Sequence, residues 1–130
     1  MSDLSDQNKQ IALTFFDQVF NQGNMDFIAQ AIDPSYRFTR DGQVLIAGGD
    51  PVASTAGWAQ GLRNSVANLH CVIEAILAED DKVALRWRMN ANDKTSNAPI
   101  TALGTNIIIF VGGKAVANDQ SGGENFEPAS

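Results

Sequence analysis

Val83-Ala84-Leu85-Arg86-Trp87-Arg88-Met89-Asn90 alternates apolar and polar side chains. A period of two is typical of a strand with one buried face, here the face of Val83, Leu85, Trp87 and Met89. Residues 72–78 have the same character, and the acidic turn 79–82 between the two runs predicts an antiparallel hairpin. Residues 100–111 and 114–120 flank Gly112-Gly113 and predict a second long hairpin.

The part of the chain before residue 70 has helical periods in three places. Ser5 is the expected N-cap of a first helix, whose apolar residues recur at i and i+4 until Gly23, a residue suited to a left-handed C-terminal position. Asn24 is expected to cap a short second helix. Asp50, followed by a proline, is expected to cap a third.

A tight hairpin is expected between the second and third helices, because residues 36–40 and 44–46 flank Asp41-Gly42. This order of elements predicts an α+β fold, in which a cone-shaped, curved antiparallel sheet of five to six strands packs on three N-terminal helices. The 130 residues are expected to form a single domain over 1–130, with a flexible tail over 124–130. Such a cone encloses an apolar interior, which predicts a small apolar molecule as the partner.

Composition excludes several classes of partner. The formal net charge of −6 repels phosphate backbones and anionic lipid, so neither nucleic acid nor a membrane is expected to bind. The single Cys71 cannot form an intramolecular disulfide and is expected to pack as a small core residue. The N-terminus lacks a basic region followed by an apolar stretch, which predicts a cytoplasmic protein. We expect no cofactor and no metal, because the chain has no phosphate-binding glycine loop and no spaced set of ligands.

Residues 15–24, 69–87 and 104–114 carry a family resemblance. Together with the order of elements from about residue 8 to 122, they resemble the nuclear transport factor 2-like superfamily, and within it the SnoaL-like polyketide cyclases and the ketosteroid isomerase-related group. The resemblance implies a cone-shaped α+β barrel with a pocket reached from its open end. It also implies a homodimer formed through the outer face of the sheet.

The activities that this resemblance implies are varied, from aldol-type cyclases and ketosteroid isomerase to scytalone dehydratase and limonene epoxide hydrolase. The acid that moves protons in the cyclases would fall on Gln120, which cannot do so, with Asp119 one residue earlier. Because neighbours in a strand face opposite sides, Asp119 would reach the pocket only through a bulge. The arginine and first acid of the epoxide hydrolase would fall on Trp87 and Met89, and phenylalanines replace the tyrosine of the isomerase's first helix.

Asp119 and His70 are the candidate catalytic residues. Asp119 could act as a general acid or base if apolar surroundings raise its pKa, or it could simply face solvent near the chain end. His70, the single histidine, could titrate near neutral pH beside a pocket carboxylate, or it could bind backbone groups at the start of its strand.

Three amides, Asn106, Asn118 and Gln120, share the parity that faces inward in the terminal hairpin. Buried amides need hydrogen-bond partners, which could be a ligand, a water or one another. Aromatic and thioether side chains would complete the pocket wall. The predicted ligand-binding residues are Tyr36, Trp58, Trp87, Met89, Asn106, Asn118 and Gln120.

Two functions from different classes remain open. The first is a cofactor-free cyclase, isomerase or dehydratase acting on an apolar carbonyl compound, with Asp119 or His70 moving the proton and Asn118 or Gln120 holding the oxygen. The second is a non-catalytic binding protein for a small apolar ligand. A titratable side chain inside the cavity would favour the enzyme.

The face opposite the buried one carries Arg86 and Arg88, with Glu74 on the partner strand. These residues predict a charge ladder that faces solvent or a second subunit. We therefore expect a homodimer.

Overall fold

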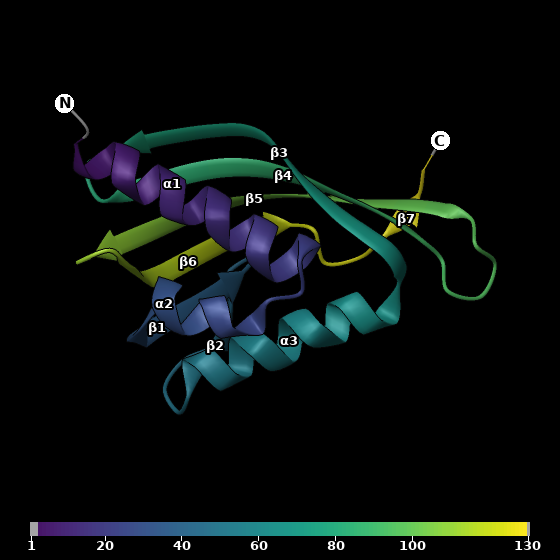
Figure 1. Cartoon of the computed structure of the whole chain (residues 1–130), viewed down its shortest axis with the longest axis horizontal. Coiled ribbons are helices and arrows are strands. Elements are labelled where there is room, and N and C mark those ends of the chain that lie inside the picture. The colour runs from purple at the N-terminus through teal and green to yellow at the C-terminus, as the bar shows by residue number, and fades with distance from the viewer. Residues whose placement is uncertain (1–2, 130) are drawn as a thin grey trace.

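Three helices and seven strands make up the described part of the chain, residues 3–129 of a computed structural model (Figure 1). The helices are α1 (Leu4–Phe16), which continues into a π-helical turn, η1 (Asp17–Asn21), then α2 (Ile28–Ala31), which follows a 3-10 turn, η2 (Met25–Phe27), and α3 (Pro51–Ser65). The strands are β1 (Ile32–Arg40), β2 (Gln43–Ile46), β3 (Ala67–Glu79), β4 (Lys82–Asn92), β5 (Pro99–Val111), β6 (Lys114–Gly122) and β7 (Glu127–Pro128).

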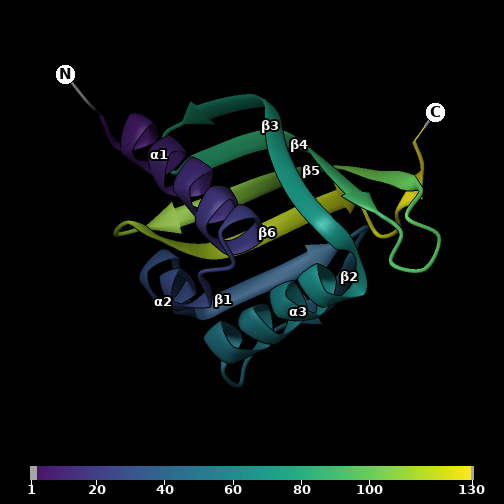
Figure 2. The same ribbon diagram turned by 45° about the vertical axis from the view of Figure 1, so that its right-hand side comes forward.

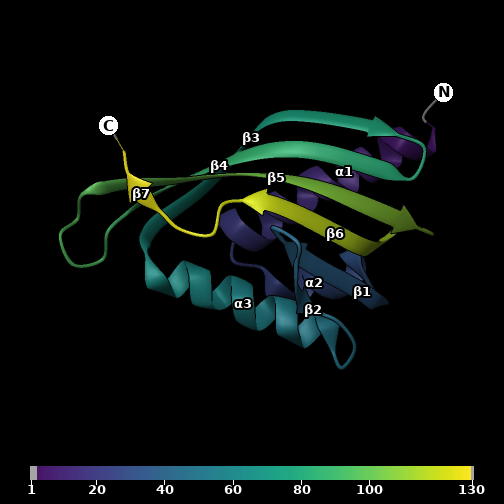
Figure 3. The ribbon, with the colours of Figure 1, turned by 180° about the vertical axis from the view of Figure 1, so that it is seen from behind.

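One curved sheet contains all the strands in the order β2-β1-β6-β5-β4-β3, with β7 paired to β5. The helix α1 crosses this sheet on the side that it curves around, and α3 lies beside β1 and β2 (Figure 2). On the opposite side, no described helix covers β3 to β6 (Figure 3). None of the described helices is long and apolar enough to cross a membrane, and the cytoplasmic location stays a prediction.

The expected α+β fold is confirmed, with two differences in the sheet. It has seven strands rather than five to six, because β7 pairs with Ile100 and Thr101 of β5 inside the tail that the sequence predicts to be flexible. It is also not wholly antiparallel, since β1 and β6 run parallel, with Phe38 opposite Asn118. The long hairpins β3–β4 and β5–β6 have the predicted antiparallel pairing.

The first helix begins earlier than predicted. Asp3, not Ser5, is the N-cap, and its Oδ1 accepts hydrogen bonds from the Asp6 backbone N–H at 2.9 Å and from the Ser5 hydroxyl at 2.7 Å. A carboxylate interacts favourably with the positive end of the helix dipole, which explains the preference for Asp3. The third helix begins as predicted, with Asp50 Oδ1 accepting from the Ala53 N–H at 3.1 Å.

The alternation of residues 83–90 places the core on one face of β4. Val83, Leu85, Trp87 and Met89 are each at most 4% exposed. The neighbouring Arg86 and Arg88 point to the other face, which is free of helices. Cys71 on β3 is also buried, as expected for a core residue.

Candidate functional site

A hollow lies inside the cone, between α1, η1, α3 and the sheet. All seven predicted ligand-binding residues line it, namely Tyr36, Trp58, Trp87, Met89, Asn106, Asn118 and Gln120. Its cavity volume is about 30 Å³, so the hollow is narrow. The structure therefore brings these residues together, while their contact with a ligand stays a prediction.

Further apolar side chains that the sequence analysis did not assign complete the wall. They are Phe15, Phe16, Phe20, Phe38 and Ile46. The phenylalanines of α1 and η1 lie on the predicted buried face of the first helix, so their helical spacing was the available signal. The wall is thus mostly apolar, as expected for a small-molecule pocket.

A chain of hydrogen bonds crosses the floor of the hollow. Trp87 Nε1 donates to Asn106 Oδ1 at 2.6 Å, and Asn106 Nδ2 donates to Asn118 Oδ1 at 2.8 Å. Asn118 Nδ2 then donates to the Tyr36 hydroxyl oxygen at 3.1 Å. Because an indole N–H can only donate, each amide must accept on the Trp87 side and donate on the other, so Trp87 determines the direction of the whole chain.

The chain ends at the Tyr36 hydroxyl. This hydroxyl accepts from Asn118, and no described residue accepts its own proton. Burial raises the pKa of Tyr36 to about 12, although the hydrogen bond from Asn118 acts in the opposite direction. The hydroxyl therefore stays protonated at neutral pH and can donate one hydrogen bond to an oxygen in the hollow.

The buried amides are paired with one another or with the backbone. Gln120 Nε2 donates to the Gly122 carbonyl at 2.8 Å, and Gln120 Oε1 lies 3.5 Å from Asn106 Nδ2. The sequence analysis left open whether a ligand, a water or neighbouring residues pair with the amides. In the structure, neighbouring residues do. A ligand is therefore not needed to give each amide a partner, while the Tyr36 hydroxyl keeps a proton that no described residue accepts.

Thr55 is a polar lining residue that the sequence analysis did not single out as a ligand contact. It lies on α3, is 6% exposed, and its hydroxyl has no hydrogen-bond partner among the described residues. A threonine inside an amphipathic helix gives no signal by itself, because its hydroxyl commonly bonds to the preceding turn. Asn8 on α1 is likewise buried and unpaired, but it does not line the hollow.

Two glycines hold the Trp87 ring in place. A Cβ atom on Gly104 would come 2.3 Å from Trp87 Cζ2, and one on Gly123 would come 2.3 Å from Cη2 of the same ring. Both positions therefore require glycine for close packing. The indole is confined to a slot that aims its N–H at Asn106, where the hydrogen-bond chain begins.

Asp119 and His70, the two candidate catalytic residues, lie outside the hollow. Asp119 is exposed and accepts a hydrogen bond from the Thr39 hydroxyl, while the next residue, Gln120, faces inward. The bulge that would turn Asp119 inward is missing, since the β5–β6 register shifts only between Ile109 and Phe110. His70 is exposed on β3 next to the buried Cys71, so regular alternation turns it outward too.

Among residues 3–129, Tyr36 is the only one lining the hollow that has an ionisable side chain. Charged groups occur in a separate, outer hollow between α3 and the C-terminal segment, where Arg40 Nη2 lies 3.5 Å from Glu124 Oε1. This outer hollow shares Trp58, Trp87 and Met89 with the central one. Its cavity volume, about 360 Å³, is larger than that of the central hollow.

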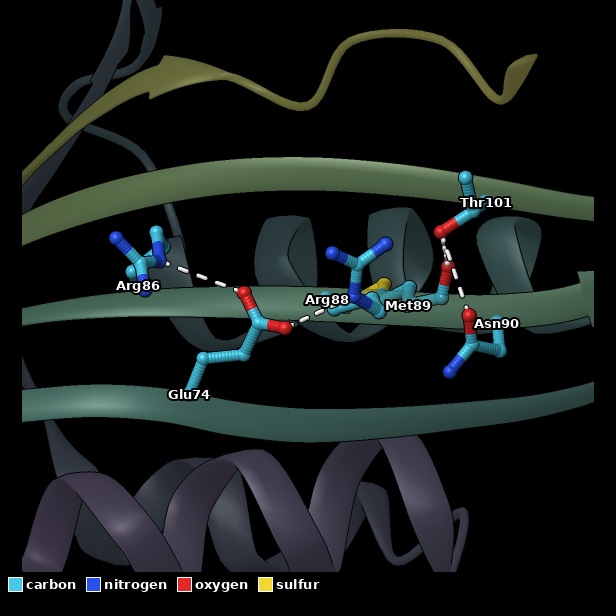
Figure 4. A network of polar contacts seen from close by, with 6 residues as sticks. All are labelled: Glu74, Arg86, Arg88, Met89, Asn90 and Thr101. Carbon is cyan, nitrogen blue, oxygen red and sulfur yellow. Dashed lines mark hydrogen bonds and ion pairs between the residues drawn. The ribbon is translucent and has the colours of Figure 1, made fainter. Parts of the chain in front are cut away.

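The outer face of the sheet carries the predicted charge ladder (Figure 4). Glu74 Oε1 lies 3.4 Å from Arg86 Nε, and Glu74 Oε2 lies 2.9 Å from Arg88 Nε. The hydrogen bond from Arg88 is the main cause that holds the pKa of Glu74 below its ordinary value. On the next strand, Thr101 donates to Asn90 Oδ1 at 3.3 Å.

Comparison with protein families identifies the class to which this fold and pocket belong. A family model described as the SnoaL-like domain matches residues 12–118. The chain therefore belongs to the SnoaL-like family, as the resemblance implies.

Solved structures agree with this assignment. A proposed polyketide cyclase from Acidithiobacillus ferrooxidans is 21% identical, with a TM-score of 0.73 over 92% of this chain and 89% of that chain. An epoxide hydrolase from M. tuberculosis is 12% identical, with a TM-score of 0.75 over 94% and 82% of the two chains. At these identities the likeness shows the fold alone. No curated protein matches the sequence.

Proposed function

We propose that this protein binds a small apolar molecule that carries an oxygen acceptor, and that the Tyr36 hydroxyl donates a hydrogen bond to that oxygen. The direction of the chain from Trp87 through Asn106 and Asn118 carries the proposal. It leaves the Tyr36 hydroxyl with a proton that no described residue accepts, on a buried group that does not ionise at neutral pH. The apolar wall selects the rest of the ligand.

The same geometry favours binding over proton transfer by a carboxylate or histidine. Neither Asp119 nor His70 lines the hollow, and a tyrosine with a pKa of about 12 is a poor base at neutral pH. A second candidate function keeps a catalytic role for Tyr36 alone. A hydrogen bond that strengthens as a carbonyl oxygen gains negative charge would lower the barrier to enolisation, with a water molecule accepting the proton from the α-carbon because no carboxylate or imidazole of a described residue lines the hollow.

A matched pair of ligands tests the binding proposal. 2-Decalone and decalin have nearly the same shape, and only the ketone has an oxygen. We expect both to change the tryptophan fluorescence, since Trp58 and Trp87 line the hollow, and the ketone to bind more tightly. In Tyr36→Phe the preference for the ketone should fall by about five-fold, the effect of one net hydrogen bond.

The double variant His70→Gln with Asp119→Asn is the control, because both residues lie outside the hollow. It should bind the ketone as the wild type does. Failure of both compounds to bind at millimolar concentration would overturn the proposed function. Equal affinity of the wild type for the two compounds would show that Tyr36 does not donate a hydrogen bond to the ligand. Hydrogen–deuterium exchange beside the carbonyl, followed by NMR, separates the two candidate functions, since only a catalyst accelerates it.

A further inference from the structure

A second, inner hollow meets the central one at Tyr36. It lies between α1, α2 and the sheet, and it shares Phe15, Tyr36 and Asn118 with the central hollow. Every other residue that lines it is apolar, including Ala12 on α1 and Ala115 on β6. Its cavity volume is about 20 Å³, so it has room only for a slender apolar group.

The polarity of the interior therefore changes along the axis of the cone. The outer hollow has the charged pair Arg40 and Glu124, the central hollow has amides and the unpaired Thr55 hydroxyl, and the inner hollow is apolar beyond Tyr36 and Asn118. The spare donor of Tyr36 stands at the boundary between the last two. A bound molecule that fills both hollows must pass this boundary.

We infer that the ligand is elongated and that its acceptor oxygen lies within the carbon skeleton, with an apolar end in the inner hollow. This inference rests on the proposed function and specifies its ligand class as internal ketones and similar compounds. An oxygen at the very end of the molecule could meet Tyr36 only by leaving one of the two hollows without apolar contacts. A terminal carboxylate is disfavoured further, because no cationic side chain lines either hollow.

Thr55 gives the ligand a direction. Its unpaired hydroxyl belongs to the central hollow and not to the inner one. A second oxygen on the ligand would therefore lie in the central hollow. The end of the ligand beyond Tyr36 remains hydrocarbon.

Isomeric ketones test the inference, because they differ only in the position of the oxygen. Undecan-2-one and undecan-4-one would be titrated against the whole chain by tryptophan fluorescence and calorimetry. Each methylene removed from an apolar site costs about four-fold in affinity, and the short side of the internal isomer is two methylenes longer, so we expect it to bind about sixteen-fold more tightly. In Ala115→Val, which narrows the inner hollow, this preference should disappear while 2-decalone still binds.

Ala12→Leu on α1 is the second variant, in case the β6 substitution prevents folding, and circular dichroism would verify each fold. Equal affinity of the two isomers for wild type would overturn the inference and leave the proposed function intact. A preference unchanged in both folded variants would also overturn it. Failure of every ketone, 2-decalone included, would instead refute the proposed function.

Discussion

Tyr36 and Cys71 are neutral acids that the fold keeps protonated. Burial is the main cause that raises the pKa of Tyr36 from 10.0 to about 12, and that of Cys71 from 9.0 to about 12, with Asp17 adding to the effect on Cys71. Both raised values make the folded state hold its protons more tightly than the unfolded state. Their contribution to stability is therefore complete below pH 9.

This pKa difference predicts alkaline destabilisation in two stages. Above pH 9 the unfolded chain loses the Cys71 proton, and above pH 10 it loses the Tyr36 proton as well. Each group should lower the free energy of unfolding by about 1.4 kcal/mol per pH unit until its folded pKa is reached. Urea titrations at pH 8, 9.5 and 10.5 would measure this loss.

Cys71→Ala separates the two contributions. Through packing, the variant differs from wild type at every pH, but its loss of stability between pH 9 and 10 should be only about a quarter of the wild-type loss, because Tyr36 is only beginning to ionise in the unfolded chain. A wild-type stability that does not change up to pH 10.5 would contradict the raised pKa values.

At the scale of elements, the strand pair β4–β5 holds the origin of the hydrogen-bond chain. Gly104 lies opposite Trp87 in this pair, and a methyl group there would overlap the indole ring. We expect Gly104→Ala to lower the free energy of unfolding by about 1–3 kcal/mol and to shift the tryptophan emission. Thermal or urea unfolding would measure the change.

Gly57 in α3 provides a matched control, since nothing lies within 4 Å of a Cβ added there. Gly57→Ala should stabilise the protein by about 0.5–1 kcal/mol, because alanine is favoured inside a helix. If both substitutions change the free energy of unfolding in the same direction, the close packing of Trp87 would not explain the need for Gly104.

The elements that the sequence could predict are those with a local period. Alternation over residues 83–90 correctly separates the buried Trp87 from the exposed Arg86, and parity brings Asn106, Asn118 and Gln120 to one hollow. The parallel pairing of β1 with β6 has no local signal, because it joins segments far apart in the chain. The short strand β7 has no local signal either, because it forms only by pairing with β5.

The π-helical turn at the end of α1 also depends on distant contacts. Asn21 in this turn uses both ends of its amide on one residue of β3, donating to the Cys71 carbonyl at 3.0 Å and accepting from the Cys71 N–H at 2.6 Å. No spacing of residues within the helix indicates such a contact. The sequence does not indicate the free hydroxyl groups of Thr55 and Tyr36 for the same reason. Whether a hydroxyl is unpaired depends on which residues from distant parts of the chain lie next to it.

For the whole molecule, the uncovered outer face supports a proposal of homodimer formation. Leu103 and Ile107 are 47% and 52% exposed on β5, beside the ladder of Glu74, Arg86 and Arg88. Exposed apolar side chains grouped next to charged ones are typical of an interface between subunits. We propose that two copies of the chain pair through this face.

Sedimentation at micromolar concentration should then give twice the mass of one chain. Ile107→Lys should produce monomers, because it places a charge in the apolar part of the face. Val44→Lys is the control, since Val44 is similarly exposed, at 48%, on β2 near the opposite edge of the sheet. A monomeric wild type would refute the dimer.

The hydrogen bond between Tyr36 and Asn118 spans 82 positions of the chain and belongs to the parallel pair β1–β6. Closing so long a loop costs chain entropy before its contacts compensate, so hairpins such as β3–β4 are expected to form first and β1 to join β6 late. The floor of the central hollow is therefore absent until folding is nearly complete. A ligand cannot help the chain to reach the transition state, but it opposes the departure of β1, so its stabilisation should be expressed as slower unfolding rather than faster folding.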